Sequence, residues 1–342
     1  MKPGDATRAV INHREVYPVP YSLGFDDGTD SILDAHYGSS DWRQRMVPYM
    51  ATVGSVDTQG YRPYDPIRQI DAYGAIWRMD RRPWHLETPP LSKPDLSSYQ
   101  LPEYKTHFFD PDLPETARRE AAAHPDSYHV LGMGWGIFEM SWRIRGFEEA
   151  LMDMAVNPEF MSELLEGITD IYLQHVAQCE GLPGDAMLFG DDWGDQRGVI
   201  MGPKRWRQFI KPCWARVWEA VHAQGRTVMC HSCGSVADII PDLIEIGLDV
   251  LESVQPEPAG MNPYELKRQF GDEITFFGCL GSQSTIQFSS PEGIRAEVNK
   301  LCREMGRGGG YILHPAKSIQ LGTPPENVVA VFESFVDQDP VR

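Results

Sequence analysis

The chain has 342 residues, of which 42% are hydrophobic and 23% are charged, as in an ordinary globular protein with room for one barrel-sized domain. Its 31 basic and 49 acidic residues give a formal net charge of −18, which argues against nucleic acids and anionic membrane surfaces as partners. No apolar run approaches the ~20 residues that cross a bilayer, and the start lacks an apolar signal core. We therefore expect a cytoplasmic protein whose six cysteines are reduced thiols, available as metal ligands or nucleophiles.

The first third of the chain, residues 1–126, is rich in Pro, Tyr, Trp and Asp and shows little sustained hydrophobic period. Its predicted elements are an edge strand over residues 16–23, short helices over 31–37 and 42–49, and a hairpin formed by 71–79 and 81–86. The prolines between residues 89 and 114 predict a long extended connection. We interpret this part as an irregular N-terminal elaboration of a single domain that spans residues 1–342.

Residues 127–342 are regular, because short apolar runs alternate with amphipathic segments. The predicted strands are 128–133, 186–189, 227–231, 250–254, 274–278 and 311–313. The predicted helices are 138–145, 148–154, 158–179 with Asn157 as its cap, 203–224, 236–246 capped by Gly247, 263–270, 291–305 and 325–336. Six strand and helix alternations, with one or two strands from the first third, predict a (β/α)8 TIM barrel. A doubly wound sheet is the alternative, but no G-x-G-x-x-G turn follows a strand.

In a barrel, the residues that follow each strand share one rim, which is where barrel enzymes place their chemistry. Loop ends are polar in any case, so these residues form a candidate set rather than a site. The set is Trp135 and Glu139; Asp191, Asp192 and Gln196; His231 and Cys233; Glu252 and Gln255; Cys279 and Gln283; His314 and Lys317.

The strongest candidate is His231-Ser232-Cys233, at the end of the predicted strand 227–231. Imidazole and thiolate ligands suit Zn²⁺, and a catalytic zinc keeps three protein ligands and one open position. A third ligand would come from the end of a later strand, at Glu252, Cys279 or His314. The alternative is a histidine bonded to the backbone beside a small buried cysteine.

Asp191-Asp192 follows the predicted strand 186–189. Adjacent carboxylates act as general acid and base when burial separates their pKa values. Neighbours in a strand face opposite sides, so the alternative is that one carboxylate caps a loop while the other faces the cavity. The basic residues of two predicted helices are candidates for binding a substrate carboxylate, although basic residues at helical spacing are more often solvated or ion-paired; they are Arg143, Arg145, Lys204, Arg205 and Arg207.

Several ordered motifs between about residues 130 and 332 resemble the uroporphyrinogen decarboxylase superfamily, which includes decarboxylases and methyltransferases that serve corrinoid proteins. The motifs are Phe189-Gly-Asp-Asp-Trp-Gly-Asp-Gln-Arg197, His231-Ser-Cys-Gly234, Gly247-Leu-Asp-Val-Leu-Glu252, Gln255-Pro-Glu257, Phe277-Gly-Cys-Leu-Gly-Ser-Gln283, Gly309-Gly-Tyr-Ile-Leu313 and Pro324-Pro-Glu-Asn327. The resemblance implies a (β/α)8 barrel with its active site at the carboxyl ends of the strands.

The two branches of that superfamily differ in their motifs. Decarboxylases carry a proline-tryptophan-phenylalanine-methionine-arginine-glutamine stretch near the start, whose arginine holds substrate carboxylates, whereas the corresponding residues 18–26 of this chain contain no arginine. The methyltransferase branch has a His-x-Cys and, far downstream, a cysteine that completes a zinc site. His231 and Cys233 match the first part, and His314 stands where that branch has cysteine.

The resemblance therefore implies a zinc-dependent methyltransferase or demethylase that exchanges a methyl group with a separate corrinoid protein. The expected zinc ligands are His231, Cys233 and His314, with Glu252 as a ligand or an orienting group. The residues expected to orient or protonate a small-molecule substrate are Asp191, Asp192, Gln196 and Gln255. A homodimeric assembly is compatible with this hypothesis.

Two other functions fit the same residues. One is a metal-independent decarboxylase of a small aromatic or polycarboxylate substrate, with Asp191 or Asp192 as proton donor and Arg143 or Arg197 holding the carboxylate. The other is a non-catalytic sensor that binds metal at Cys233.

Overall fold

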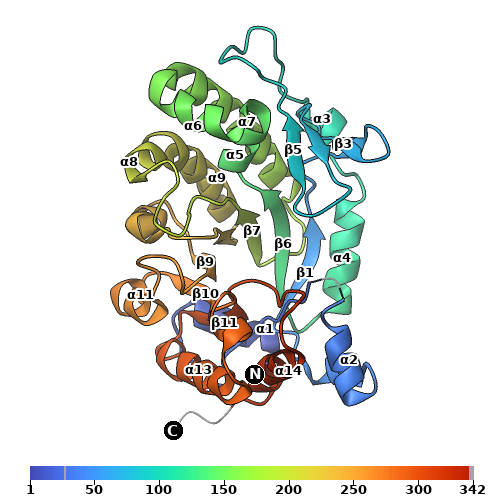
Figure 1. The fold of residues 1–342 in the computed structure, drawn as a ribbon, viewed down its shortest axis with the longest axis vertical. Coiled ribbons are helices and arrows are strands. Elements are labelled where there is room, and N and C mark those ends of the chain that lie inside the picture. Colours follow the sequence, from blue (N-terminus) through green and yellow to red (C-terminus); the bar gives the residue numbers. More distant parts are fainter. Residues whose placement is uncertain (27, 339–342) are drawn as a thin grey trace.

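The computed structural model of the protein describes residues 1–26 and 28–338, and its centre is a curled sheet of seven parallel strands (Figure 1). The strand order is β1-β6-β7-β8-β9-β10-β11, so each strand pairs with its neighbour in this sequence. The strands are β1 (Met50–Ser55), β6 (Tyr128–Trp135), β7 (Ala186–Gly190), β8 (Thr227–His231), β9 (Val250–Val254), β10 (Thr275–Leu280) and β11 (Tyr311–Pro315). Their carboxyl ends meet at one rim, as the barrel prediction requires.

The segment between the helices Pro3–Ile11 and Ser31–Tyr37 occupies the place of an eighth strand. Tyr21 forms a parallel bridge with Leu313 of β11, and the Leu313 N–H donates to the Pro20 carbonyl. On its other side, the Tyr21 ring packs on Tyr49, just before β1, with 5.2 Å between ring centroids. The predicted edge strand over residues 16–23 is thus a single bridge, and side chains complete the curled sheet into a TIM barrel.

The barrel interior follows the two-residue alternation of extended strands. Its apolar layer contains Met229 of β8, Val250 of β9 and Ile312 of β11, and these belong to one buried cluster. The intervening residues of the same strands, such as Val228 and Leu251, belong to a second, larger cluster under the helices. Two residues beyond the interior layer, each of the three strands reaches a polar residue at the rim.

The helices lie outside the curled sheet, and most of them follow the sequence prediction (Figure 1). The sequence did not predict α1 (Pro3–Ile11) and α4 (Leu113–Ala123). The helices and single turns are α1, α2 (Ser31–Tyr37), η1 (Asp41–Arg45), α3 (Tyr104–His107), α4, α5 (Ile137–Arg145), α6 (Phe147–Val156), α7 (Pro158–Gln178), α8 (Pro203–Arg205), η2 (Trp206–Ile210), α9 (Lys211–Ala223), η3 (Ala237–Ile239), α10 (Ile240–Glu245), α11 (Pro263–Phe270), α12 (Thr285–Phe288), α13 (Pro291–Glu304) and α14 (Pro325–Val336).

A second sheet of four antiparallel strands lies at the end to which β6 points (Figure 1). It consists of β2 (Arg62–Pro63), β3 (Arg68–Ile70), β4 (Ile76–Arg78) and β5 (His85–Thr88). The predicted hairpin is confirmed as the β4 and β5 pair. Its first part is a turn instead, because the buried Asp71 carboxylate accepts hydrogen bonds from the Tyr73 and Ala75 N–H groups.

Three further predictions were wrong in detail. Residues 42–49 form only the short η1 helix, because Pro48 has no N–H and forces the preceding residue into an extended conformation. The connection 89–114 is interrupted by α3. The Asn157 side chain does not cap α7, because its Nδ2 donates to Asp153 instead.

The helix predicted over residues 203–224 contains one wider turn, η2, with π-helical hydrogen bonding. Pro212 lies just beyond it and cannot donate a backbone hydrogen bond, which accounts for the local change of period. Across residues 1–26 and 28–338, no helix combines the length and apolar character needed to span a membrane.

Candidate metal centre

The polar rim residues continue the interior faces of the strands. His231 lies two residues beyond Met229, and Glu252 lies two residues beyond Val250, so both side chains enter the barrel from neighbouring strands. The backbone register pairs His231 directly with Glu252. Parallel pairing therefore brings the imidazole and the carboxylate together.

Three ligand atoms converge at this rim. The Nε2 atom of His231 lies 3.2 Å from the Cys233 Sγ and 3.6 Å from the Asp192 Oδ1. All three atoms lie within 4.8 Å of one another, and among the described residues no other group of His, Cys, Asp and Glu meets that condition. Nitrogen, sulfur and carboxylate oxygen at this spacing are the donors of a tetrahedral zinc site. All three residues are half-buried, so the group is accessible from the rim.

The Glu252 carboxylate binds the second nitrogen of the His231 imidazole. Its Oε2 atom makes a short contact with the His231 Nδ1, which fixes the orientation of the ring and leaves Nε2 directed at Cys233 and Asp192. Burial lowers the pKa of His231, but Glu252 and Cys233 outweigh it and hold that pKa well above its usual value. A metal ion at Nε2 would have to displace that proton.

The loop after β8 is held by hydrogen bonds from its own backbone. The Cys233 N–H donates to the Asp192 Oδ1 over 2.7 Å, and the Gly234 N–H donates to the Gln255 Oε1 over 2.9 Å. Gly234 has a φ of +77°, and a Cβ there would lie 2.4 Å from the Gly194 backbone. Only glycine allows the two loops to approach closely enough to place Cys233 beside Asp192.

Asp191 points away from this cluster and is fully buried. Its carboxylate accepts bonds from the backbone N–H groups of Phe138 and Glu139 at the start of α5. The indole N–H groups of Trp193 and Trp214 also donate to it. Burial raises the pKa of Asp191 to about 6, although all four donors favour the charged form. The two carboxylates thus divide the roles, because Asp191 binds the helix start and Asp192 faces the cavity.

The other residues predicted from the sequence lie around the cluster without joining it. His314 packs its ring against Phe277, with 4.9 Å between ring centroids, and its Nδ1 has no partner. Cys279 is buried in the hydrophobic core, and Gln196 is exposed. Arg197 is also exposed, with 91% of its side chain accessible.

One role at this centre was not anticipated. Asp192 was expected to act as an acid or base, and the structure brings it to ligand distance. The Gly-Asp-Asp run at a strand end predicted that Asp192 lies on the rim. Its closeness to Cys233 became visible only in the structure, where the loop at Gly234 packs against Gly194.

The sequence model of the uroporphyrinogen decarboxylase (URO-D) family matches residues 75–337, which contain this entire centre. The chain belongs to the uroporphyrinogen decarboxylase family. Its curated relatives are distant: the uroporphyrinogen decarboxylase of Nitrosomonas europaea is 36% identical over 70 residues, or 20% of this chain and 19% of that enzyme. The Coxiella burnetii enzyme is 22% identical over 54% of this chain and 51% of its own length.

Among solved structures, a methyltransferase from Methanosarcina mazei superposes with a TM-score of 0.71 and covers 99% of both chains at 18% identity. At that identity the likeness establishes the shared fold. The chain aligns with about half of the Coxiella relative and less of the Nitrosomonas one, so family membership leaves the reaction to the residues of the site.

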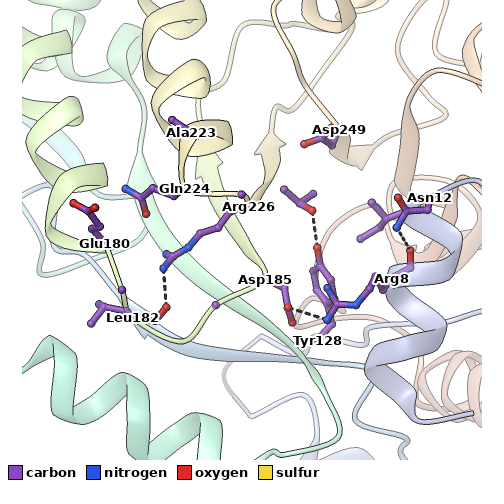
Figure 2. Close-up of a pocket in the computed structure, with 15 residues that line it drawn as sticks. Arg8, Asn12, Tyr128, Glu180, Leu182, Asp185, Ala223, Gln224, Arg226 and Asp249 are labelled. Atoms are coloured by element: carbon purple, nitrogen blue, oxygen red, sulfur yellow. Dashed lines mark hydrogen bonds and ion pairs between the residues drawn. The ribbon is translucent and has the colours of Figure 1, made fainter.

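One cavity of this family member lies at the opposite end of the barrel, near the start of β7 and β8 (Figure 2). It has a volume of about 700 Å³ and is lined mostly by polar side chains. The Arg226 Nη2 donates to the Leu182 carbonyl, and Arg8 pairs with Asp185, as drawn in Figure 2. In TIM barrels this end serves stability rather than chemistry.

Proposed function

We propose that this member of the family is a zinc-dependent methyltransferase that exchanges a methyl group between a small molecule and a separate corrinoid protein. The observation that carries the proposal is the convergence of Asp192 Oδ1, His231 Nε2 and Cys233 Sγ within 4.8 Å. The overall similarity to the Methanosarcina mazei methyltransferase is consistent with it.

The donor set fits zinc in three respects. Its ligands are the nitrogen, sulfur and oxygen types that zinc binds, they number three, and one side stays open. Glu252 supplies the carboxylate that commonly supports a zinc-bound histidine. When bound there, zinc would lower the pKa of a substrate thiol or polarise a methoxy oxygen.

The residues of the chain would then divide the remaining work. Asp192 would hold the Cys233 loop through its backbone bond as well as contribute a ligand. Gln255 would keep Gly234 in place, and Asp191 would anchor α5. His314 and Glu252 remain the alternative source of the third ligand, but the geometry favours Asp192, because Glu252 is engaged by the other histidine nitrogen.

Metal analysis and a transfer assay test this proposal together. We expect stoichiometric zinc in the purified protein, and transfer of the methyl group of methylcobalamin to a small thiol, which leaves cob(I)alamin with the electron pair of the broken bond. Cys233→Ala should lose both properties. Cys302→Ala is the matched control, because Cys302 is a buried thiol of α13 remote from the rim. Absence of a transition metal, or full activity of Cys233→Ala, would refute the proposal.

A metal-independent decarboxylase is the second candidate, and one observation favours it. Burial, with Asp191 and Asp192 nearby, raises the pKa of Glu139 well above its usual value. A carboxyl group that stays protonated at neutral pH can donate a proton to a developing carbanion. This reading predicts activity that survives chelators and is lost in Glu139→Gln, whereas the methyltransferase should lose its activity with the metal.

A further inference from the structure

The guanidinium group of Arg143 is a buried charge that forms no hydrogen bond or ion pair with a described carboxylate. Arg143 lies on α5, and only 3% of the residue is exposed. Among the described residues its one hydrogen bond runs from Nη1 to the Tyr61 hydroxyl, over 2.9 Å, and its Nε has no partner. No ion pair to a described carboxylate is within reach. A buried charge in this state is costly and is normally found with a partner.

Indole rings surround this guanidinium. Its central carbon lies 4.6 Å from the Trp77 ring centroid, 5.0 Å from that of Trp135 and 5.9 Å from that of Trp142. Cation–π attraction from these rings offsets part of the desolvation. The aromatic rings provide no hydrogen-bond acceptor for Nε. The N–H groups along an edge of a guanidinium can donate in parallel to the two oxygens of a carboxylate.

The two nearest acidic residues are not substitutes for that partner. The Asp71 carboxylate already accepts bonds from Tyr73, Ala75 and the Trp77 indole. Glu139 lies one helical turn before Arg143, forms no ion pair with it among the described residues, and has a pKa that burial raises well above its usual value. Both carboxyl groups act on the Arg143 charge electrostatically, but neither forms a hydrogen bond or ion pair with the guanidinium among the described residues, so its Nε–H still lacks an acceptor.

The position of Trp135 connects this charge to the metal centre. In the strand register Trp135 pairs with Gly190, and Gly190 pairs with His231. Two strand spacings of about 4.8 Å separate the backbones of Trp135 and His231, on the order of 10 Å. A Cβ at Gly190 would lie 3.9 Å from the His231 Cβ, so the strand between them offers no side chain as an obstacle. Trp135 is itself 41% exposed.

We propose that Arg143 binds a carboxylate of the substrate, with the aromatic rings of Trp77, Trp135 and Trp142 around the same end of the molecule. The inference rests on the proposed function for the other end, where Cys233 and its neighbours would hold the methyl-bearing heteroatom. The substrate class is thus a small carboxylic acid that carries its methyl donor or acceptor atom at the end of the molecule opposite the carboxylate.

Calorimetric titration of the chelator-treated protein with benzoate tests the subsite without requiring the metal or the methyl transfer. Benzamide is the neutral probe of the same shape, and phenylphosphonate distinguishes a phosphoryl site from a carboxylate site. We expect benzoate to bind, benzamide not to bind, and Arg143→Met to weaken benzoate by about 10- to 100-fold, as expected for a charged hydrogen-bonded pair. Arg197→Met, which removes an exposed arginine of the rim, should bind as the unaltered protein does.

Arg143→Lys keeps the charge but lacks the planar fork, so it should also bind benzoate more weakly. If Arg143→Met does not fold, this variant decides the matter. The inference is overturned if benzoate does not bind, if benzamide binds equally well, if phenylphosphonate binds more tightly, or if Arg143→Lys binds benzoate without loss. If the unaltered protein binds benzoate but shows no methyl transfer, the proposed function is refuted and the carboxylate subsite still stands.

Discussion

The two ends of the barrel use similar side chains for opposite purposes. At the end where the strands start, Arg226 Nη2 donates to the Leu182 carbonyl and Arg8 donates to the Asp185 carboxylate (Figure 2). Arg226 also donates to the Cys179 carbonyl, and Asp185 also accepts from the His129 N–H. At the other end, three ligand atoms of Asp192, His231 and Cys233 face one another.

The polar side chains at the two ends of the barrel therefore have different binding partners. Side chains at the lower end satisfy backbone atoms that the turns between helices and strands leave exposed. At the upper rim the Glu252 side chain orients the His231 ring, and Asp192 and Gln255 accept the N–H groups of the Cys233 loop, so these polar groups converge on the three candidate ligand atoms. Substitutions at the lower end should therefore change stability, whereas substitutions at the rim should change metal binding.

The largest expected effect is the loss of zinc from Asp192→Ala, because this change removes one of three converging ligand atoms. His314→Ala should keep its zinc, since His314 lies outside the cluster. Asp195→Ala is a control for loop damage, because Asp195 also accepts two backbone N–H bonds in the same loop. Zinc content after dialysis measures all three, and loss from His314→Ala with retention in Asp192→Ala would reverse the ligand assignment.

Arg226→Met should reveal the structural role of the lower end. The change leaves two buried carbonyls without their charged donor, so we expect the free energy of unfolding to fall by about 3 kcal/mol. Arg8→Met lines the same cavity but removes a largely exposed pair, for which a loss below about 1 kcal/mol is expected. Urea denaturation measures both. A drop in zinc content without destabilisation in Arg226→Met would contradict this division between the two ends.

Glu252→Gln separates orienting a ligand from being one. The amide keeps the shape of the side chain but weakens its hold on the His231 Nδ1, and such changes typically reduce metal affinity by about 10- to 100-fold. Competition with a chromogenic zinc chelator measures the affinity. Glu257→Gln is the matched control, because the Glu257 carboxylate accepts from Gln283 and Ser284 in a neighbouring loop and should leave zinc affinity unchanged. Equal effects of both changes would mean that Glu252 acts only through general charge.

The sequence predicted the upper rim better than it predicted the packing beneath it. Apolar runs that end in Gly190-Asp191 and Cys230-His231 mark strand ends, and parallel strands place their ends together. The role of Asp191 was not visible, because its four donors come from the start of α5, from Trp193 and from Trp214. These contacts are set by the fold rather than by local spacing.

The same limit explains the misplaced elements of the first third. β1 contains a glycine and only a few apolar residues, so its pairing with β6 rather than its own pattern makes it a strand. Helix α4 is rich in alanine and charge, with only Leu113 and Ala117 buried, and its short apolar stripe was hidden among prolines. The closeness of Asp192 to His231 and Cys233 was not visible from the sequence for a related reason, because it depends on the meeting of Gly194 with Gly234.

Two histidines extend the comparison to pH, and the expected effect is the smallest. His175 on α7 is fully buried among Tyr104, Phe108 and Tyr172, neither of its ring nitrogens has a partner, and burial lowers its pKa to about 4. Because the folded pKa lies below the unfolded value of about 6.5, its stability contribution is complete above pH 6.5 and is lost as the pH falls toward 4.

The corresponding loss in the free energy of unfolding between pH 8 and pH 5 is about 2 kcal/mol, and His175→Phe should remove that part of the pH dependence. His222 is the control of opposite sign. Asp249 raises its pKa, so it stabilises the fold at low pH and His222→Asn should steepen the loss on acidification. Urea unfolding of the three proteins at both pH values measures the difference. An unchanged slope in His175→Phe would show that His175 takes up its proton without unfolding, and that the packing around α7 admits water.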